Sequence, residues 1–215
     1  MNVFSPSVAA DGDRPRRTFL HVGCGGKRQD QTTRGFANAA LWRELRLDID
    51  PNVAPDSVGS MTDMSAPADA SVDAIISSHN IEHLYPHEVP RAPAEFLRVV
   101  KPDGFVVITC PDLQSVCRLV AEGNLTEPFY TSPAGPIAPL DMLYGHRASL
   151  ARGNLHMAHR CGFTQKVLVG TLQAAGFKMV TSRVRAAHWD LWAVAGKSMR
   201  THEEMRQPAL EHIPQ

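Results

Sequence analysis

An apolar run that ends abruptly in glycines is the feature that most constrains the fold of this chain. Residues 18–22 are apolar and rich in β-formers, and Gly23-Cys24-Gly25-Gly26 follows them directly. Continuous apolarity is typical of a parallel strand that is covered on both faces. Glycine lets the backbone turn sharply and approach a ligand closely, although a tight turn alone would also require it. The sequence therefore predicts a buried strand that leads into a tight, possible ligand-binding loop.

The rest of the chain alternates between expected strands and helices. Further strands are expected at residues 44–49, 57–60, 72–78, 105–110, 177–185 and 188–194. Helices are expected at residues 86–100 and 113–121, and a third follows Thr164 as its N-cap and runs to Ala175, with Gly176 as its stop. Pro93 marks either a kink or a late start of the first helix. This alternation predicts an α/β fold, a parallel sheet with helices on both faces.

The chain is long enough for one sizeable α/β domain. Its 215 residues fall short of two full domains. We expect a disordered flank at residues 1–17, the domain at residues 18–199 and a flexible polar tail at residues 200–215. Residues 123–162 contain several prolines and little regular pattern, which is typical of a lid or substrate-binding segment.

Two acidic residues follow expected strands. Ligands of open α/β sheets bind outside the carboxyl ends of the strands. Asp48 ends the second strand, where a carboxylate can accept hydrogen bonds from both hydroxyls of a ribose. Asp63 follows the third strand and could reach an adenine amino group, with Met64 packed on the ring. Either acid alone could be a solvated turn residue, but together they favour a pocket for an adenosyl ligand.

Two other nucleotide motifs are absent. Gly23 and Gly25 match the first two positions of the dinucleotide fingerprint G-x-G-x-x-G, but Arg28 occupies the third, where glycine allows close packing of helix on strand. A P-loop needs G-K-[ST], whereas Arg28 follows Lys27. An NAD-linked oxidoreductase is therefore a disfavoured alternative.

Several runs resemble the successive motifs of class I S-adenosylmethionine (SAM)-dependent methyltransferases, of the small bacterial type-11-like group. They are FLHVGCGG at 19–26, LDID at 47–50, DAIISSHNIEHL at 73–84, EFLRVVKPDG at 95–104, GFT at 162–164 and AGF at 175–177. The resemblance covers about residues 18–195. It implies a Rossmann-like, mostly parallel twisted sheet of about seven strands, the last one antiparallel. It also implies SAM as cofactor and an enzyme that methylates an O or N atom of a small-molecule acceptor.

The resemblance also implies cofactor contacts for individual residues. Gly23, Cys24 and Gly25 would contact the methionyl part of SAM, Asp48 with Ile49 the ribose, Asp63 and Met64 the adenine, and Ser78 and His79 the region of the methyl group. His21 stands where the family has an acidic residue that contacts the methionyl amino group. This departure leaves a non-catalytic SAM-binding module as an alternative to an enzyme.

Ten histidines supply candidates for a base or a metal ligand. His79, His83 and His87 are spaced by four residues with Glu82 among them, and on a helix they would form one face of zinc-type ligands. Because Pro86 interrupts the run, we assign no metal ligand, and loop, capping or substrate-binding roles stay open. His titrates in the useful range for a general base, so His79 is the first candidate, and His146 and His159 follow.

The runs 144–147 and 154–160 also carry two arginines. Arg147 and Arg160 could recognise an acidic or hydroxyl-bearing substrate, because a guanidinium binds carboxylates in a bidentate manner. The histidines and arginines of this segment could instead satisfy backbone carbonyls.

The overall charge and the cysteines exclude several classes of partner. Lys plus Arg and Asp plus Glu both number 22, so no basic excess predicts nucleic acid as a partner. No apolar run approaches the roughly 18 residues of a membrane span. The four cysteines show no disulfide framework, and the first residues show no secretory signal, so a cytoplasmic location is expected. The sequence does not indicate an oligomeric state.

Overall fold

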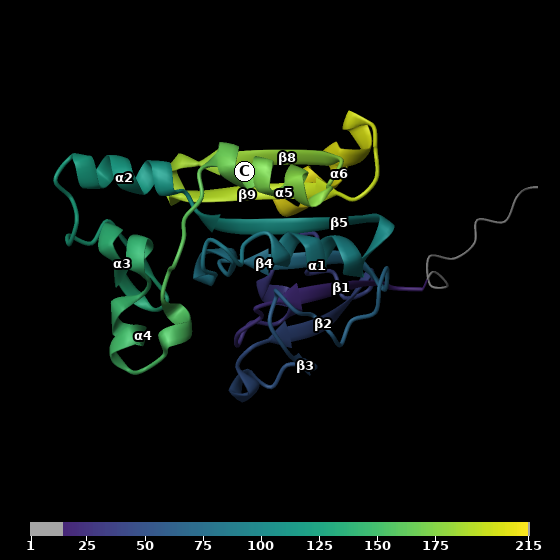
Figure 1. Cartoon of the computed structure of the whole chain (residues 1–215), viewed down its shortest axis with the longest axis horizontal. Helices are drawn as coiled ribbons and strands as arrows, with labels where there is room; N and C mark the ends of the chain where they lie inside the picture. The colour runs from purple at the N-terminus through teal and green to yellow at the C-terminus, as the bar shows by residue number, and fades with distance from the viewer. Residues whose placement is uncertain (1–14, 215) are drawn as a thin grey trace, which may run out of the picture.

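Seven strands form the central sheet of residues 15–214, the part of the chain that this computed structural model describes. Their order across the sheet is β3-β2-β1-β4-β5-β9-β8 (Figure 1). The strands are β1 (Arg17–Val22), β2 (Trp42–Asp48), β3 (Ser57–Val58), β4 (Val72–Ser78), β5 (Val100–Pro111), β8 (Met179–Arg185) and β9 (Asp190–Gly196). The pairs among β1 to β5 are parallel, and β9, the last strand in the chain, runs antiparallel between β5 and β8. The predicted Rossmann-like fold class is thus confirmed.

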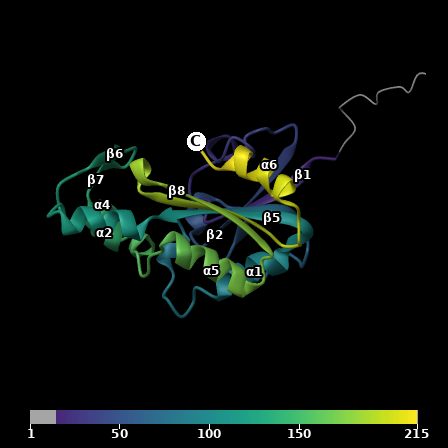
Figure 2. The ribbon, with the colours of Figure 1, turned by 90° about the horizontal axis from the view of Figure 1, so that it is seen from above.

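Helices cover both faces of this sheet. Figure 2 shows α1 (Arg91–Val99) and α5 (Gln165–Ala175) on one face and α6 (His202–His212) on the other. Helix α1 begins at Arg91 and not at residue 86, which confirms the late start, and Pro93 lies in the first turn, where its missing N–H costs no hydrogen bond. Helix α5 has the predicted caps, because Thr164 Oγ1 accepts a hydrogen bond from the Val167 amide and Gly176 is left-handed.

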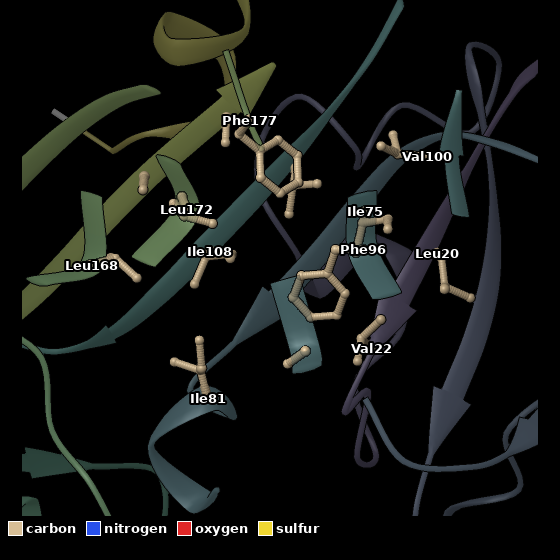
Figure 3. Close-up of a cluster of buried hydrophobic side chains, with 14 of the residues drawn as sticks. Leu20, Val22, Ile75, Ile81, Phe96, Val100, Ile108, Leu168, Leu172 and Phe177 are labelled. Atoms are coloured by element: carbon tan, nitrogen blue, oxygen red, sulfur yellow. The ribbon is translucent and has the colours of Figure 1, made fainter. Parts of the chain in front are cut away.

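The larger apolar core lies between the sheet and the helices α1 and α5. Figure 3 shows side chains from both sides of this interface pointing toward one another. Leu20, Ile75 and Ile108 come from the strands, Phe96 from α1, and Leu172 from α5, and all are buried. This packing fixes the strands whose carboxyl ends build the pocket described below.

Residues 123–162 contain more regular structure than the sequence predicts. Strands β6 (Tyr130–Ser132) and β7 (Gly135–Ile137) pair as a hairpin, and α3 (Pro139–Tyr144) and α4 (Arg147–Ala151) follow. In Figure 1 this segment and α2 (Leu113–Ala121) lie beyond the carboxyl ends of the parallel strands, which the arrowheads mark. The segment therefore stands at the edge of the sheet where ligands of this fold bind.

The expectation of a frayed tail at residues 200–215 is wrong. Helix α6 occupies most of this stretch, and it starts with a capping box in which Thr201 and Glu204 bond each other's amides. Its buried Met205 and Ile213 close a second core with Phe19, Phe36 and other residues of the opposite face. The tail is polar on average, but Met205, Ala209 and Ile213 pack into this core, whereas Leu210 is 42% exposed. At the other end, β1 already starts at Arg17, inside the expected flank, and residues 1–14 of that flank lie outside the described part of the chain.

None of the helices in residues 15–214 combines the length and the apolar character that a membrane-spanning helix needs.

Burial of His212 should make stability depend on pH. Its ring packs on Phe36 and Phe105, at centroid distances of 4.1 and 5.2 Å, and its Nδ1 is hydrogen-bonded to Thr33 Oγ1 at 2.6 Å. Burial lowers the pKa of His212 to about 3. Between pH 6.5 and about 3 the unfolded chain therefore binds a proton that the folded chain does not. In this window we expect the free energy of unfolding to decrease as the pH is lowered. The contribution of His212 is at most about 1.4 kcal/mol per pH unit.

Urea unfolding curves from pH 7 to pH 4 check this expectation. His212→Phe keeps a ring between the aromatic neighbours but does not titrate, so its stability should vary less with pH. His202→Ala, at an exposed position of the same helix, is the control and should keep the wild-type slope. An unchanged slope in His212→Phe would contradict the prediction.

Candidate cofactor-binding and active site

A pocket of about 430 Å³ lies at the carboxyl ends of β1, β2 and β4. This volume is within the usual range for sites that bind small molecules. The predicted cofactor residues that line it are His21, Gly23, Cys24, Gly25, Asp48, Ile49, Ser78 and His79. The sheet order explains why they meet, because β1 lies between β2 and β4.

The glycine loop after β1 is shaped by Asn80, which lies in the loop after the neighbouring strand β4. Gly23 and Gly25 have φ angles of +63° and +52°, a conformation that side chains with a Cβ disfavour. A Cβ on Gly23 would lie 2.3 Å from Asn80 Oδ1, whereas one on Gly25 would meet open space. The Asn80 amide group donates hydrogen bonds to the carbonyls of Val22, at 2.9 Å, and Ser78, at 3.1 Å. Asn80 therefore joins the ends of β1 and β4 and requires a glycine between them.

Arg46 and Asp48 hold the same loop to β2. The buried Arg46 guanidinium donates hydrogen bonds to the carbonyls of Gly25, at 2.6 Å, and Ala54, at 2.7 Å. The Asp48 carboxylate accepts the Gly25 amide at 2.7 Å and the Asp50 amide at 2.9 Å. Because Asp48 accepts only these two hydrogen bonds from backbone amides of residues 15–214, it has further lone pairs for hydroxyl groups of a ligand. Sequence reasoning missed Arg46 and Asn80, because neither belongs to a glycine motif.

His21 is paired inside the protein. Its Nδ1 donates to Glu44 Oε1 at 2.7 Å, and both side chains are nearly buried. Burial lowers the pKa of His21, and the hydrogen bond to Glu44 opposes this effect only in part. At position 21, where the resemblance implies an acid, the chain thus has a histidine whose own partner is an acid on β2. Cys24 also lines the pocket, and burial raises its pKa to about 11, so its side chain is a neutral thiol at neutral pH.

The predicted adenine contacts of Asp63 and Met64 are not supported by the structure. Neither residue lines the pocket; Asp63 is exposed and Met64 is fully buried in the core. The backbone of Met64 is fixed to α1, because its amide donates to Glu95 Oε2 and its carbonyl accepts from Arg98 Nη2, both at 2.7 Å. Met61 lines the pocket in its place. The sequence could not separate two methionines of one loop whose turn geometry was unknown.

The three histidines proposed as bases lie in different places. His79 directly follows β4 and has a φ of +55°; its side chain is 44% exposed and lines the pocket. His146 bonds Ser149 Oγ and does not line it. His159 faces a neighbouring pocket, and its Nδ1 donates to the Met142 carbonyl at 2.8 Å. His79 alone of these three candidates is next to the predicted cofactor.

His79 has an acidic neighbour. Its Nδ1 lies 3.5 Å from Oε1 of Glu82, whose side chain is only 1% exposed. Burial would raise the pKa of Glu82, but His79, His83 and His159 outweigh this effect, and the pKa lies below its usual value. Glu82 is thus an ionised carboxylate behind His79 at neutral pH. A carboxylate in this position can stabilise an imidazole that accepts a proton.

The two arginines proposed to bind the substrate, Arg147 and Arg160, differ in their hydrogen bonding. Arg147 binds the Asp141 carboxylate with two nitrogens, at 2.8 and 3.0 Å, so its fork is occupied. Arg160 lines both the cofactor pocket and the neighbouring pocket, and it donates to the His83 carbonyl at 2.6 Å. The predicted substrate contact is therefore better placed at Arg160.

Comparison with known proteins agrees with this geometry. The family model of a methyltransferase domain matches residues 20–108, the span that contains the glycine loop, Asp48 and His79. Residues 20–108 belong to the class I SAM-dependent methyltransferases. No curated protein matches this chain.

Solved structures share the fold of this chain. The N1-methyltransferase of 1,6-didemethyltoxoflavin from Burkholderia thailandensis has a TM-score of 0.54 and 16% identity, over 86% of this chain and 72% of that one. A possible histamine N-methyltransferase from Thermotoga maritima has a TM-score of 0.53 and 13% identity, over 86% and 84%. A TehB-like SAM-dependent methyltransferase from Corynebacterium glutamicum has a TM-score of 0.50 and 18% identity, over 87% and 84%. At these identities the likeness is one of fold.

Alanine substitutions in the glycine loop should separate backbone strain from steric overlap. We expect Gly25→Ala to cost about 1–2 kcal/mol, the strain of a left-handed alanine in open space. Gly23→Ala should cost about 1–3 kcal/mol more, because its methyl group overlaps Asn80. Gly26→Ala, with ordinary φ and open space, is the control and should be close to neutral. Thermal or urea unfolding measures all three, and equal costs at positions 23 and 25 would refute the role given to Asn80.

Proposed function

We propose that this methyltransferase transfers the methyl group of SAM to an oxygen or nitrogen atom of a small molecule. The observation that carries the proposal is the pocket in which the glycine loop, Asp48 and His79 meet at three adjacent strand ends. SAM is the cofactor of this domain. The acceptor class is our proposal and rests on the residues around that pocket.

The pocket suggests how SAM lies. The methionyl part lies along the glycine loop, Asp48 accepts hydrogen bonds from the ribose hydroxyls, and the sulfonium lies near Ser78 and His79. Ile49 lines the pocket and is 50% exposed, so the bound nucleoside would cover its apolar side chain. Met61, and not the predicted Met64, lies beside the adenine ring.

Methyl transfer from a sulfonium requires little covalent help. The acceptor atom attacks the methyl carbon, the carbon–sulfur bond breaks, and sulfur keeps the electron pair. The protein aligns the three atoms and excludes water. His79 takes the proton that a hydroxyl or ammonium acceptor loses, and Glu82 behind it stabilises the resulting imidazolium.

A second pocket supports a small acceptor. It is lined by Glu82, Tyr144, His159 and Arg160, among others, and Arg160 also lines the cofactor pocket. The polar side chains of this second pocket, together with Arg160 at its border, can orient a small polar molecule toward His79. The structure from Burkholderia thailandensis holds 1,6-didemethyltoxoflavin together with S-adenosylhomocysteine, which fits an acceptor of this size.

Replacement of Asp48 should weaken SAM binding. Asp48→Asn removes the charge that strengthens hydrogen bonds to the ribose, which are worth about 1.5–3 kcal/mol each, so we expect the Kd for SAM to rise about 10- to 100-fold. Titration calorimetry measures the Kd. Asp63→Asn is the control, since Asp63 lies outside the pocket, and should leave the Kd unchanged. The reverse pattern would show that the adenosyl group lies over Asp63.

Replacement of His79 should lower turnover far more than SAM affinity. His79→Asn suits the left-handed backbone of this position but removes the base, so we expect label transfer to fall about 10²- to 10⁴-fold. The assay incubates protein and methyl-labelled SAM with a metabolite extract and counts label in products, while calorimetry follows SAM binding. His146→Gln, outside the pocket, should keep wild-type transfer. Equal transfer in His79→Asn removes the assignment, and SAM binding without any transfer by the wild type favours a binding module.

A further inference from the structure

Glu82 is a buried carboxylate whose oxygens have no hydrogen-bond partner in the described part of the chain. Its side chain is 1% exposed. The ring nitrogen of His79, at 3.5 Å, is farther away than in an ordinary hydrogen bond. Burying an ionised carboxylate without a partner is costly. A position of this kind indicates that a positively charged ligand completes the site.

Two imidazoles face this carboxylate. One nitrogen each of His83 and His159 and one oxygen of Glu82 lie within 4.8 Å of one another. His83 Nδ1 donates to the Ala158 carbonyl at 3.0 Å, and His159 Nδ1 donates to the Met142 carbonyl at 2.8 Å. Because Nδ1 of both rings carries the hydrogen, Nε2 of both rings carries a lone pair. Histidines that bind metals show this arrangement, in which the second nitrogen donates to a carbonyl or carboxylate.

We propose that Glu82, His83 and His159 bind a divalent transition-metal ion of the zinc type. Two imidazole nitrogens and one carboxylate oxygen suit zinc and its neighbours better than magnesium or calcium, which prefer oxygen ligands alone. The spacing of His79, His83 and His87 suggests a different set. The structure stacks His87 on Tyr85, at a centroid distance of 5.7 Å, and His159 from a distant segment joins Glu82 and His83 instead.

The backbone holds these three residues in place before any ion binds. The Arg160 amide donates to the Glu82 carbonyl at 2.8 Å, and the Arg160 guanidinium donates to the His83 carbonyl at 2.6 Å. The segment that carries His159 is thereby fixed against the turn that carries Glu82 and His83. Ligands around a tetrahedral zinc lie about 3.3 Å apart, so binding has only to draw the side chains together by an ångström or so.

The site lies at the border between the two pockets. His83 lines the cofactor pocket, whereas Glu82 and His159 line the neighbouring pocket. Three protein ligands leave a fourth position for a water molecule or a substrate atom, as in catalytic zinc sites. A further role rests on the proposed function: an acceptor hydroxyl on the ion would lose its proton more readily and would be oriented toward SAM.

Zinc titration of the full chain tests the site without SAM. The protein is treated with a chelator, dialysed and titrated with zinc chloride in a calorimeter. We expect one equivalent to bind with a Kd in the micromolar range or below, and Glu82→Gln and His159→Gln to weaken binding at least tenfold. His146→Gln and Cys161→Ser are the controls, because they remove a distant histidine and a nearby thiol outside the ligand set, and both should bind as the wild type does.

Two further measurements keep the result unambiguous. Circular dichroism and SAM titration show whether each variant is folded, since SAM binds in the other pocket. Cobalt(II) in place of zinc should give the visible absorption of a tetrahedral site with nitrogen and oxygen ligands in the wild type and not in the folded variants. Absence of stoichiometric zinc binding, or binding that both variants retain, would overturn the proposal.

The metal proposal and the proposed function fail separately. Zinc binding that persists in protein that does not bind SAM supports the site and contradicts the methyltransferase proposal. Label transfer that is the same with zinc-loaded and chelator-treated protein would leave the metal site intact but remove its role in methyl transfer.

Discussion

The pocket of this protein depends on one buried cation, Arg46. Its guanidinium reaches from β2 to the carbonyl of Gly25 on one side and to those of Val53 and Ala54 on the other. The loops that follow β1 and β2 therefore share one anchor, and neither can move without breaking a charge-assisted hydrogen bond. Loss of these hydrogen bonds would leave a buried guanidinium without acceptors, which is far more costly than loss of a surface contact.

Asn80 extends this constraint to the third loop. Because β4 pairs with β1, the side chain of Asn80 reaches back to Val22 and packs against Gly23. Three loops from three adjacent strands are thus fixed to one another by side chains that line or underlie the pocket. A ligand that binds there meets a surface whose shape is set before binding, which reduces the entropy lost on association.

Most of the fold could be predicted from the sequence because its signals are local. The apolar run of β4 and the caps of α5, Thr164 and Gly176, gave element positions that the structure confirms. Helix α6 was missed because its mean composition is polar, although the Thr201–Glu204 capping box was a readable signal. The hairpin and short helices of residues 123–162 depend on contacts with α2 and with the turn after β4 that contains Glu82. No local sequence pattern reveals these contacts.

The candidate site was predictable only where it follows strands. His21, Gly23, Asp48 and His79 lie at strand ends, and the rule for parallel sheets brings such residues together. Whether Met61 or Met64 lines the pocket depends on the geometry of the turn at Ser60–Asp63, which the sequence does not reveal. The meeting of Glu82 with His159 depends on how a separate segment returns to the sheet, so spacing along the chain suggested other histidines.

The position of α6 has a consequence for the order in which this protein forms during synthesis. The aromatic side chains Phe19, Phe36 and Trp42 come early, and the helix that covers them begins at His202, which lies 160 residues after Trp42. A ribosome must translate all the residues between them before that face of the nascent sheet is shielded from water. Until then the growing chain exposes an aromatic, aggregation-prone surface of the kind that chaperones bind.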